Sequence, residues 1–203
     1  MTKDAASPDK TIAFQGEPGA NSHIACREAF PDMTDLPCDT FEDVFAAVNE
    51  GRARLAMIAI ENSLAGRVAD VHHLIPGAGL YIVGEHFLPV RHQLLGLKGS
   101  RIEDIRTVHS HVHALGQCRR AIRELGLKAV VAADTAGAAR QVVEAADKTR
   151  AAIASNPAAD IYGLDVPRAD IADDTHNTTR LPVTAQAPNA PQPQEAPGLT
   201  HIM

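Results

Sequence analysis

Small polar residues and glycines follow a series of short apolar segments in this sequence of 203 residues. The residues that share this placement are Gly16, Gly19, Ser22, Glu61, Asn62, Ser63, Ser110, Thr135 and Ser155. If the apolar segments are parallel strands, these groups gather at the strands' carboxyl ends, where helix N-termini offer N–H groups and a favourable dipole to an anion. Each residue taken alone is better explained as a helix cap. Their repetition predicts a binding edge for a small anion.

The segment Asn177-Thr178-Thr179-Arg180 places two hydroxyls beside a guanidinium. Arg can hold a carboxylate through two parallel hydrogen bonds, and a neighbouring hydroxyl can donate to a second oxygen of the same ligand. The segment therefore predicts contact with a carboxylate ligand. The alternative interpretation is an exposed polar loop.

Three histidines alternate at His109, His111 and His113. On a strand they would share one face, as metal ligands do. No Asp follows them at the next positions, and the remaining histidines show no matching spacing. We therefore expect no metal site, and a metal-dependent hydrolase remains a minor alternative.

Other catalytic motifs are absent from the sequence. The turn Gly16-Glu-Pro-Gly19 lacks the Lys of a P-loop and the three-glycine spacing of a dinucleotide fingerprint. There is no nucleophile elbow and no Ser-His-Asp signature. Cys26 and Cys118 fall on predicted amphipathic helices, so we expect them to be core residues rather than nucleophiles.

The elements that must position these residues alternate between strand and helix. Apolar runs predict strands over 11–15, 55–60, 80–84, 106–109, 129–133 and 151–154. Helices are expected over 21–29, from the Thr40 capping box onward, over 66–74, along a stripe from 115 to 125, over 135–146 and from 155. This order requires parallel sheets covered by helices. The extended stretch 87–97 suggests a division into two lobes.

Composition narrows the class of protein. The chain is 45% apolar with a formal net charge of −6, which argues against a nucleic-acid partner. The apolar run 55–60 is far shorter than a membrane span of about 20 residues, so we expect no membrane partner. Three cysteines without paired spacing favour a reducing, cytoplasmic location. Residues 1–10 and the Pro-rich stretch 184–203 are expected to be a flexible tail and a disordered tail.

Five segments in register resemble the prephenate dehydratase family. They are Gly16–Ser22, Ile60–Gly66, His109–Cys118, Ala133–Ala139 and Asn177–Arg180. The resemblance implies an α/β fold of two lobes, similar to type II periplasmic binding proteins, with helices on mostly parallel sheets and the active site in the cleft. Lobe 1 would comprise about 11–86 plus a returning segment 171–183, and lobe 2 about 90–170. It also implies conversion of prephenate to phenylpyruvate, water and carbon dioxide in phenylalanine biosynthesis, without a cofactor. We further expect that the chain can form a homodimer.

The same resemblance assigns roles to individual residues. Thr179 would donate a hydrogen bond to the departing hydroxide, and Arg180 would hold substrate carboxylates or shape the pocket. The positions implied as polar donors to the substrate are Asn62, Ser110 and Gln117. The positions implied as lining the site are Ser63, Thr135 and Ser22.

The sequence departs from the family pattern after Arg180. Leu181 stands where the family has Phe, and a Pro-rich stretch stands where a regulatory ACT domain commonly follows. We expect Leu181 and Pro182 to leave a loose junction that lowers activity, and we expect no feedback by phenylalanine. A truncation or frameshift and a natural short form both remain open. So do a truncated inactive dehydratase and a non-catalytic protein that binds a small anion.

Overall fold

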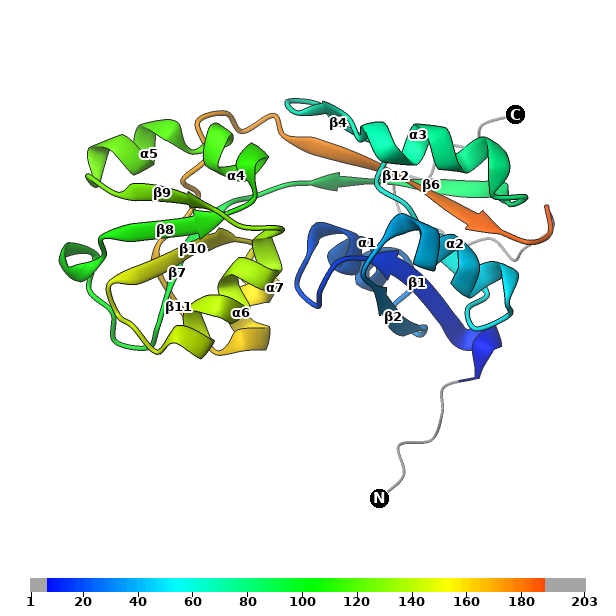
Figure 1. Cartoon of the computed structure of the whole chain (residues 1–203), viewed down its shortest axis with the longest axis horizontal. Helices are drawn as coiled ribbons and strands as arrows, with labels where there is room; N and C mark the ends of the chain where they lie inside the picture. The colour runs from blue at the N-terminus through cyan, green and yellow to red at the C-terminus, as the bar shows by residue number, and fades with distance from the viewer. Residues whose placement is uncertain (1–6, 189–203) are drawn as a thin grey trace, which may run out of the picture. The chain divides into compact units, whose positions relative to one another are not determined.

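The computed structural model describes residues 7–188 (Figure 1). The described chain divides into two compact units. Unit 1 comprises the segment ending at Gly16, Ser22–Leu88 and the segment starting at Thr178, whereas unit 2 comprises Glu17–Asn21 and Pro89–Asn177. Within this described part, no helix has the length and apolar character needed to cross a membrane.

Unit 1 is built on a seven-stranded sheet in the order β2-β1-β3-β12-β4-β5, with β6 paired to β12. Its strands are β1 (Thr11–Gln15), β2 (Thr34–Cys38), β3 (Leu55–Met57), β4 (Glu61–Asn62), β5 (Gly66–Arg67), β6 (Tyr81–Pro89) and β12 (Thr178–Ala185). Its helices are η1 (Pro8–Lys10), α1 (Asn21–Ala29), α2 (Phe41–Asn49), α3 (Ala69–Leu74) and η2 (Ile75–Gly77). β1 runs parallel to β2 and β3, and β12 runs antiparallel to β3 and β4.

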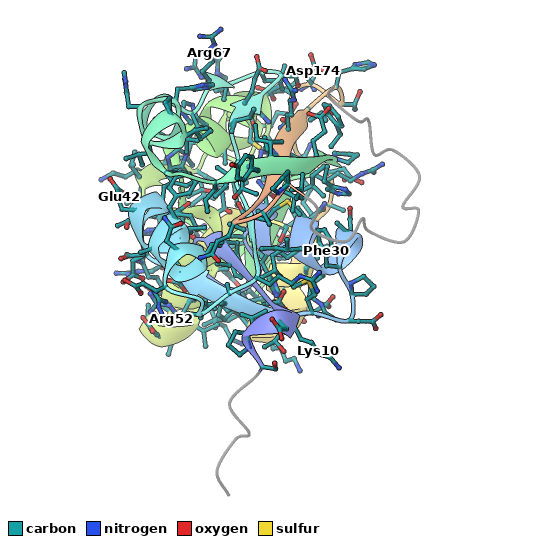
Figure 2. All side chains as sticks on the ribbon, turned by 90° about the vertical axis from the view of Figure 1, so that its right-hand side faces the viewer. Lys10, Phe30, Glu42, Arg52, Arg67 and Asp174 are labelled. Atoms are coloured by element: carbon teal, nitrogen blue, oxygen red, sulfur yellow. The ribbon has the colours of Figure 1, made fainter. Side chains whose placement is uncertain are left out.

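The central strands of unit 1 are buried on both faces. On one face Phe14, Met57 and Leu181 pack with residues of α1, and on the other Ala13 and Ile58 pack with residues of α2. Because successive strand residues point to opposite faces, a strand covered on both sides must be apolar throughout. This explains why the interior of β1 and the whole of β3 are apolar in the sequence. The charged side chains labelled in Figure 2 project outward from the ribbon; they are Lys10, Glu42, Arg52, Arg67 and Asp174.

β12 is a continuous strand where the sequence led us to expect a loose junction. Leu181 is fully buried, and the Pro182 carbonyl accepts a hydrogen bond from the Ile58 N–H at 3.0 Å. The strand continues to Ala185, so the predicted start of the disordered tail at residue 184 is wrong for these first residues. The rest of that tail, 189–203, lies outside the described residues, and η1 occupies the end of the predicted flexible 1–10 segment.

Unit 2 is built on a five-stranded sheet in the order β11-β7-β10-β8-β9. Its strands are β7 (Gln93–Gly96), β8 (Thr107–Ser110), β9 (Lys128–Val131), β10 (Arg150–Ala154) and β11 (Asp165–Arg168). Its helices are η3 (Ile102–Asp104), α4 (Val112–Gln117), α5 (Arg119–Glu124), α6 (Thr135–Ala145) and α7 (Asn156–Tyr162). β8 is parallel to β9 and β10, whereas β7 is antiparallel to β10 and β11. The predicted α/β class is confirmed, with sheets that mix parallel and antiparallel pairs.

Two apolar clusters sandwich this sheet. Val108 and Ile153 belong to the cluster that contains Leu115 of α4 and Ala121 of α5. The opposite cluster is largely alanine, with Ala152 and Ala154 of β10 packed among alanines of α6 and α7. Small side chains let these helices lie close to the sheet.

Candidate functional site

In unit 1, predicted site residues meet where β12 pairs with β4. Thr179 lies opposite Asn62 in the strand register. The Asn62 Nδ2 donates to Thr179 Oγ1 at 3.0 Å and to the Thr178 carbonyl at 3.3 Å. Thr179 is only 7% exposed. The fold therefore brings together two residues from distant segments that the sequence analysis singled out independently.

The side-chain amide of Asn62 is held in one orientation. Its Oδ1 accepts hydrogen bonds from the N–H groups of Leu64 at 3.1 Å and Ala65 at 2.9 Å. The amide NH₂ must therefore point the other way, toward Thr179. A hydroxyl oxygen that accepts a hydrogen bond still carries its own proton, so this arrangement prepares the Thr179 hydroxyl to act as a donor.

Ser63 fixes the backbone from which Thr179 projects. Its N–H donates to the Thr178 carbonyl at 2.9 Å, and its Oγ accepts from the Thr178 N–H at 3.0 Å. These two bonds continue the β4–β12 pairing beyond the end of β4. The role of Ser63 in lining a substrate site stays a prediction.

Arg180 has a protein partner, Glu85. The Arg180 Nε donates to Glu85 Oε2 at 2.6 Å, and the Glu85 side chain is only 4% exposed. Because consecutive strand residues point to opposite faces, Arg180 leaves the strand on the side away from Thr179. Arg180 thus compensates a buried carboxylate, and its role as a ligand for substrate carboxylates stays a prediction. Glu85 was not predicted from the sequence, where its signal is a single carboxylate within the mostly apolar segment Tyr81–Pro89.

In unit 2, Gln117 at the end of α4 is the centre of a polar cluster. Its Oε1 lies 2.7 Å from His92 Nε2 and accepts from Asn177 Nδ2 at 2.9 Å. His92 and Asn177 are both buried. Burial lowers the pKa of His92, so this imidazole is neutral at neutral pH. His92 was not predicted as a site residue, because nothing in its local sequence indicates that it contacts Gln117.

Residues 170–177, which we call the strap, are tied along unit 2 by main-chain hydrogen bonds. The Ile171 N–H donates to the His92 carbonyl at 2.9 Å, and the Asp173 N–H donates to the Gln117 carbonyl at 2.7 Å. At the end of the strap, the Val90 N–H donates to the Asn177 carbonyl at 2.7 Å. The strap therefore fixes Asn177, two residues before Thr179 in the chain.

Three further predicted positions lie within the folded units, where their contacts serve the fold. Ser110 is fully buried and donates its hydroxyl proton to the Ile153 carbonyl at 2.6 Å, and its role as a donor to the substrate stays a prediction. Thr135 is the first residue of α6, whose N-cap is Asp134 rather than Thr135. The Asp134 carboxylate, bound to the Gly137 N–H, already occupies the place an anion would take. Ser22 is buried in the first turn of α1.

The histidine alternation does not produce a metal site. β8 ends at Ser110, so only His109 lies on a strand, while His111 caps α4 by accepting from the His113 N–H at 3.3 Å. The alternative in which all three histidines share one strand face therefore does not hold. Across residues 7–188, no group of three or more His, Cys, Asp or Glu side chains is placed to hold a metal ion.

Cys26 and Cys118 are core residues, as predicted, and so is Cys38. Cys26, Cys38 and Cys118 are all buried and unbridged. Burial raises the pKa of Cys26, and it raises the pKa of Cys118 to about 12. These thiols are therefore protonated at neutral pH and are poor nucleophiles.

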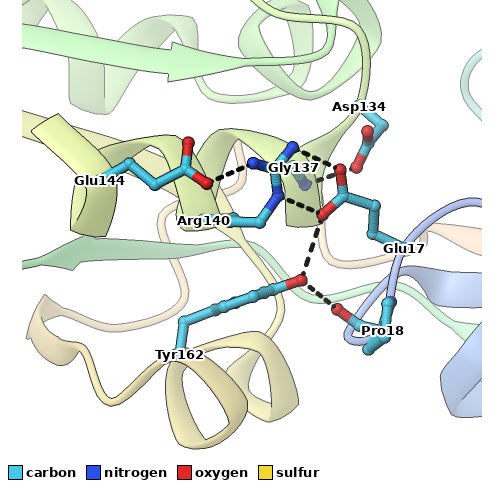
Figure 3. A network of polar contacts seen from close by, with 7 residues as sticks. All are labelled: Glu17, Pro18, Asp134, Gly137, Arg140, Glu144 and Tyr162. Atoms are coloured by element: carbon cyan, nitrogen blue, oxygen red, sulfur yellow. Dashed lines mark hydrogen bonds and ion pairs between the residues drawn. The ribbon is translucent and has the colours of Figure 1, made fainter.

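The turn after β1 is held by α6 and α7 through Glu17 (Figure 3). Both Glu17 carboxylate oxygens accept from Arg140, from Nε and Nη2, each at 2.8 Å. Tyr162 Oη donates to the Pro18 carbonyl at 2.9 Å and lies 3.3 Å from Glu17 Oε2. Burial and the Glu17 charge raise the pKa of Tyr162 to about 12. The polar groups of this turn thus bind other parts of unit 2.

Gly19 is required in this turn for steric reasons, and we expect Gly19→Ala to destabilise the chain. Its φ is +92°, and an added Cβ would lie 2.9 Å from the Ala158 Cα. The expected loss in unfolding free energy is about 2–4 kcal/mol, combining backbone strain and overpacking. Gly66→Ala is the matched control, because Gly66 has φ of +81° but open space around its Cβ position. Urea unfolding that gives equal losses for both variants would contradict the steric argument.

We expect the Glu17–Arg140 pair to make stability depend on acid pH. The hydrogen bonds from Arg140 lower the pKa of Glu17 below its ordinary value of 4.5. A lowered pKa in the folded state stabilises the fold above the unfolded pKa, and this contribution is lost as pH falls through the folded pKa. The difference in unfolding free energy between the parental chain and Glu17→Gln should therefore be largest near neutrality and shrink below pH 4.5. A difference that stays constant from neutral to acid pH would refute this, and Glu42→Gln on the exposed surface of α2 is the control.

Comparison with known proteins connects these features to one family. A family model described as prephenate dehydratase matches residues 12–189. The match continues past Arg180, so the expectation that the resemblance stops there is wrong. The chain is 53% identical over 190 residues to a protein of Komagataeibacter europaeus described as a bifunctional N-acyl-homoserine lactone acylase/prephenate dehydratase, covering 94% of this chain and 67% of that protein. It is 42% identical over 181 residues to arogenate dehydratase/prephenate dehydratase 1 of Arabidopsis thaliana, covering 89% of this chain and 46% of that protein.

Solved structures show the same fold. The prephenate dehydratase of Arthrobacter aurescens, solved with L-Phe, matches with a TM-score of 0.81 at 28% identity, over 92% of this chain and 63% of that chain. A structure described as GqqA, a quorum-quenching acylase, matches with a TM-score of 0.81 at 54% identity, over 89% of this chain and 65% of that chain. The chain thus spans about two thirds of the bacterial proteins and about half of the plant protein.

Proposed function

Since the chain belongs to the prephenate dehydratase family, we propose that it converts prephenate to phenylpyruvate, water and carbon dioxide, a step toward phenylalanine. The observation that carries this proposal is the Asn62–Thr179 hydrogen bond, which prepares the Thr179 hydroxyl as a donor. The plant relatives include arogenate dehydratases, so arogenate is a second substrate to assay.

The proposed chemistry needs a donor more than it needs a strong acid. The bond between the ring and its carboxylate breaks, its electron pair enters the ring, and the C–O bond to the ring hydroxyl breaks as the ring becomes aromatic. The departing oxygen gains negative charge, and a positioned hydroxyl stabilises that charge. A Thr hydroxyl is too weakly acidic to remain ionised, so the proton that completes water is relayed through it from solvent. The electron pair that makes the ring aromatic comes from the broken bond between the ring and its carboxylate. The proposed reaction therefore includes neither a cofactor nor a metal.

The direct test is incubation of the purified chain with prephenate and measurement of phenylpyruvate. We expect turnover by the parental chain without added metal and with a chelator present. Saturable binding of prephenate without product would instead support the non-catalytic anion-binding alternative. Loss of activity with a chelator, restored by zinc, would overturn the metal-free mechanism.

A second candidate is hydrolysis of N-acyl-homoserine lactones, favoured by the similarity to the Komagataeibacter europaeus protein. The described structure supports it less, because Ser110 and Ser155 both donate their hydroxyl protons to main-chain carbonyls and are not poised as nucleophiles. Release of homoserine lactone from an acylated substrate, measured beside the prephenate assay, decides between one activity and two.

The buried free cysteines lead us to propose a reducing compartment, the cytoplasm, as the location.

A further inference from the structure

We infer that His92 and Asn177 are positioning residues for Gln117, which hold its side-chain amide so that the nitrogen, and not the oxygen, is presented to the substrate. The observation is that both buried side chains converge on the same atom, Gln117 Oε1. This inference rests on the proposed function, in which Gln117 donates to the substrate. It concerns only residues of unit 2.

Gln117 Oε1 can only accept hydrogen bonds. His92 must therefore carry its proton on Nε2, and Asn177 must turn its NH₂ toward Gln117. The two donors lie at 2.7 and 2.9 Å, good hydrogen-bond distances. With its oxygen occupied from two directions, the planar amide of Gln117 directs its NH₂ away from both partners.

The reverse orientation of Gln117 is costly because the partners are buried. His92 is 4% exposed and Asn177 is 2% exposed. Turning the amide around would place its NH₂ against two other donors, unless His92 changed tautomer and the Asn177 amide turned at the same time. Donors this deeply buried cannot turn to water instead. The orientation of Gln117 is therefore set before any ligand arrives, which is the condition for an effective donor.

Main-chain hydrogen bonds hold the two positioning residues themselves in place. The His92 carbonyl accepts from the Ile171 N–H, and the Asn177 carbonyl accepts from the Val90 N–H. Each residue is thus anchored to a segment near the other. The strap and residues 90–92 are thus hydrogen-bonded to each other, and they carry the two side chains that bind Gln117.

A double-mutant cycle tests this inference. His92→Leu removes the donor, and we expect kcat/KM for prephenate to fall about tenfold, the value of one lost hydrogen bond of about 1.4 kcal/mol. In a Gln117→Leu background the same substitution should change kcat/KM by less than about twofold, because the amide it positions is gone. His92→Gln retains an N–H donor at a similar reach, and should recover most of the activity. Equal losses in both backgrounds, or no rescue by His92→Gln, would overturn the inference.

Nitrogen-15 NMR of the parental chain tests the geometry without any turnover. At a pH where free imidazole is neutral, His92 should show the Nε2–H tautomer, and Gln117→Leu should shift its resonance. An Nδ1–H tautomer would overturn the inference directly. If prephenate is not converted but the Nε2–H tautomer is found, the proposed function fails while the orientation of the amide stands, so the two failures are distinguishable.

Discussion

Replacing Thr179 by Val is expected to lower the turnover of prephenate about a hundredfold to a thousandfold while leaving KM nearly unchanged. Val keeps the shape and the strand preference of Thr but lacks the hydroxyl that Asn62 prepares as a donor. Loss of one preorganised donor to a developing negative charge commonly costs about 10²–10³ in rate. Initial rates of phenylpyruvate formation over a range of prephenate concentrations measure both constants. A variant that keeps more than about half of the parental turnover would remove Thr179 from the mechanism.

The neighbouring hydroxyl offers a matched control. Thr178 is hydrogen-bonded to Ser63 and Asn62 through its backbone groups, and Thr178→Val keeps these bonds. Thr178 lies next to Thr179 on β12 and therefore projects to the opposite face. We expect the turnover of Thr178→Val to stay within a fewfold of the parental value. This result would show that the position of the hydroxyl matters and not the Thr-to-Val change itself.

Removing the guanidinium of Arg180 is expected to destabilise the chain strongly. Arg180→Met would leave the Glu85 carboxylate, 4% exposed, without its cation. Breaking a fully buried pair in this way costs about 3–5 kcal/mol. The Arg180 side chain is 34% exposed, and water can therefore compensate part of the loss. We expect a decrease of about 2–3 kcal/mol in unfolding free energy, measured by urea denaturation.

The double variant Arg180→Met with Glu85→Gln separates this cause from a general disturbance of β12. Gln has nearly the same shape as Glu and no charge, so it removes the uncompensated carboxylate. The double variant should recover at least half of the stability lost by Arg180→Met alone. A double variant that is as unstable as the single one would show that Arg180 matters for packing and not for charge.

Local signals in the sequence were sufficient where short-range contacts decide the structure. Thr40 was predicted to begin a helix, and its Oγ1 accepts from the Asp43 N–H in the first turn of α2. Ser155 likewise caps α7 by accepting from the Ala158 N–H. In both cases the deciding contact lies within three residues of the cap.

Contacts between distant segments account for what was missed. β2 has little apolar character and includes Pro37, and it forms a strand because β1 supplies a parallel partner. The expected helical stripe from 115 to 125 breaks at Cys118, where the backbone leaves the helical region at ψ of +24°. Strand pairing of this kind depends on tertiary neighbours that a sequence window does not contain.

In the candidate site too, single residues could be predicted from the sequence, whereas contacts between distant segments could not. Asn62, Thr179 and Arg180 were identified from their positions in the sequence, and Gln117 from the family resemblance. The partners of Arg180 and Gln117, which are Glu85 and His92, were not predicted. Glu85 lies 95 residues from Arg180, and His92 lies 25 residues from Gln117. Contacts between residues so far apart in the sequence, whether ion pairs or positioning hydrogen bonds, can be identified only from the folded structure.

The alanine-rich side of unit 2 has a consequence for how stability varies with temperature. Six of the nine buried residues in that cluster are Ala. Burying Ala costs no side-chain rotamer entropy, but it also withdraws less apolar surface from water than burying Leu or Phe would. The heat capacity of unfolding scales with the apolar surface that becomes exposed. This half of the unit therefore contributes a shallow curve of free energy against temperature, with stability that changes little between cold and warm conditions.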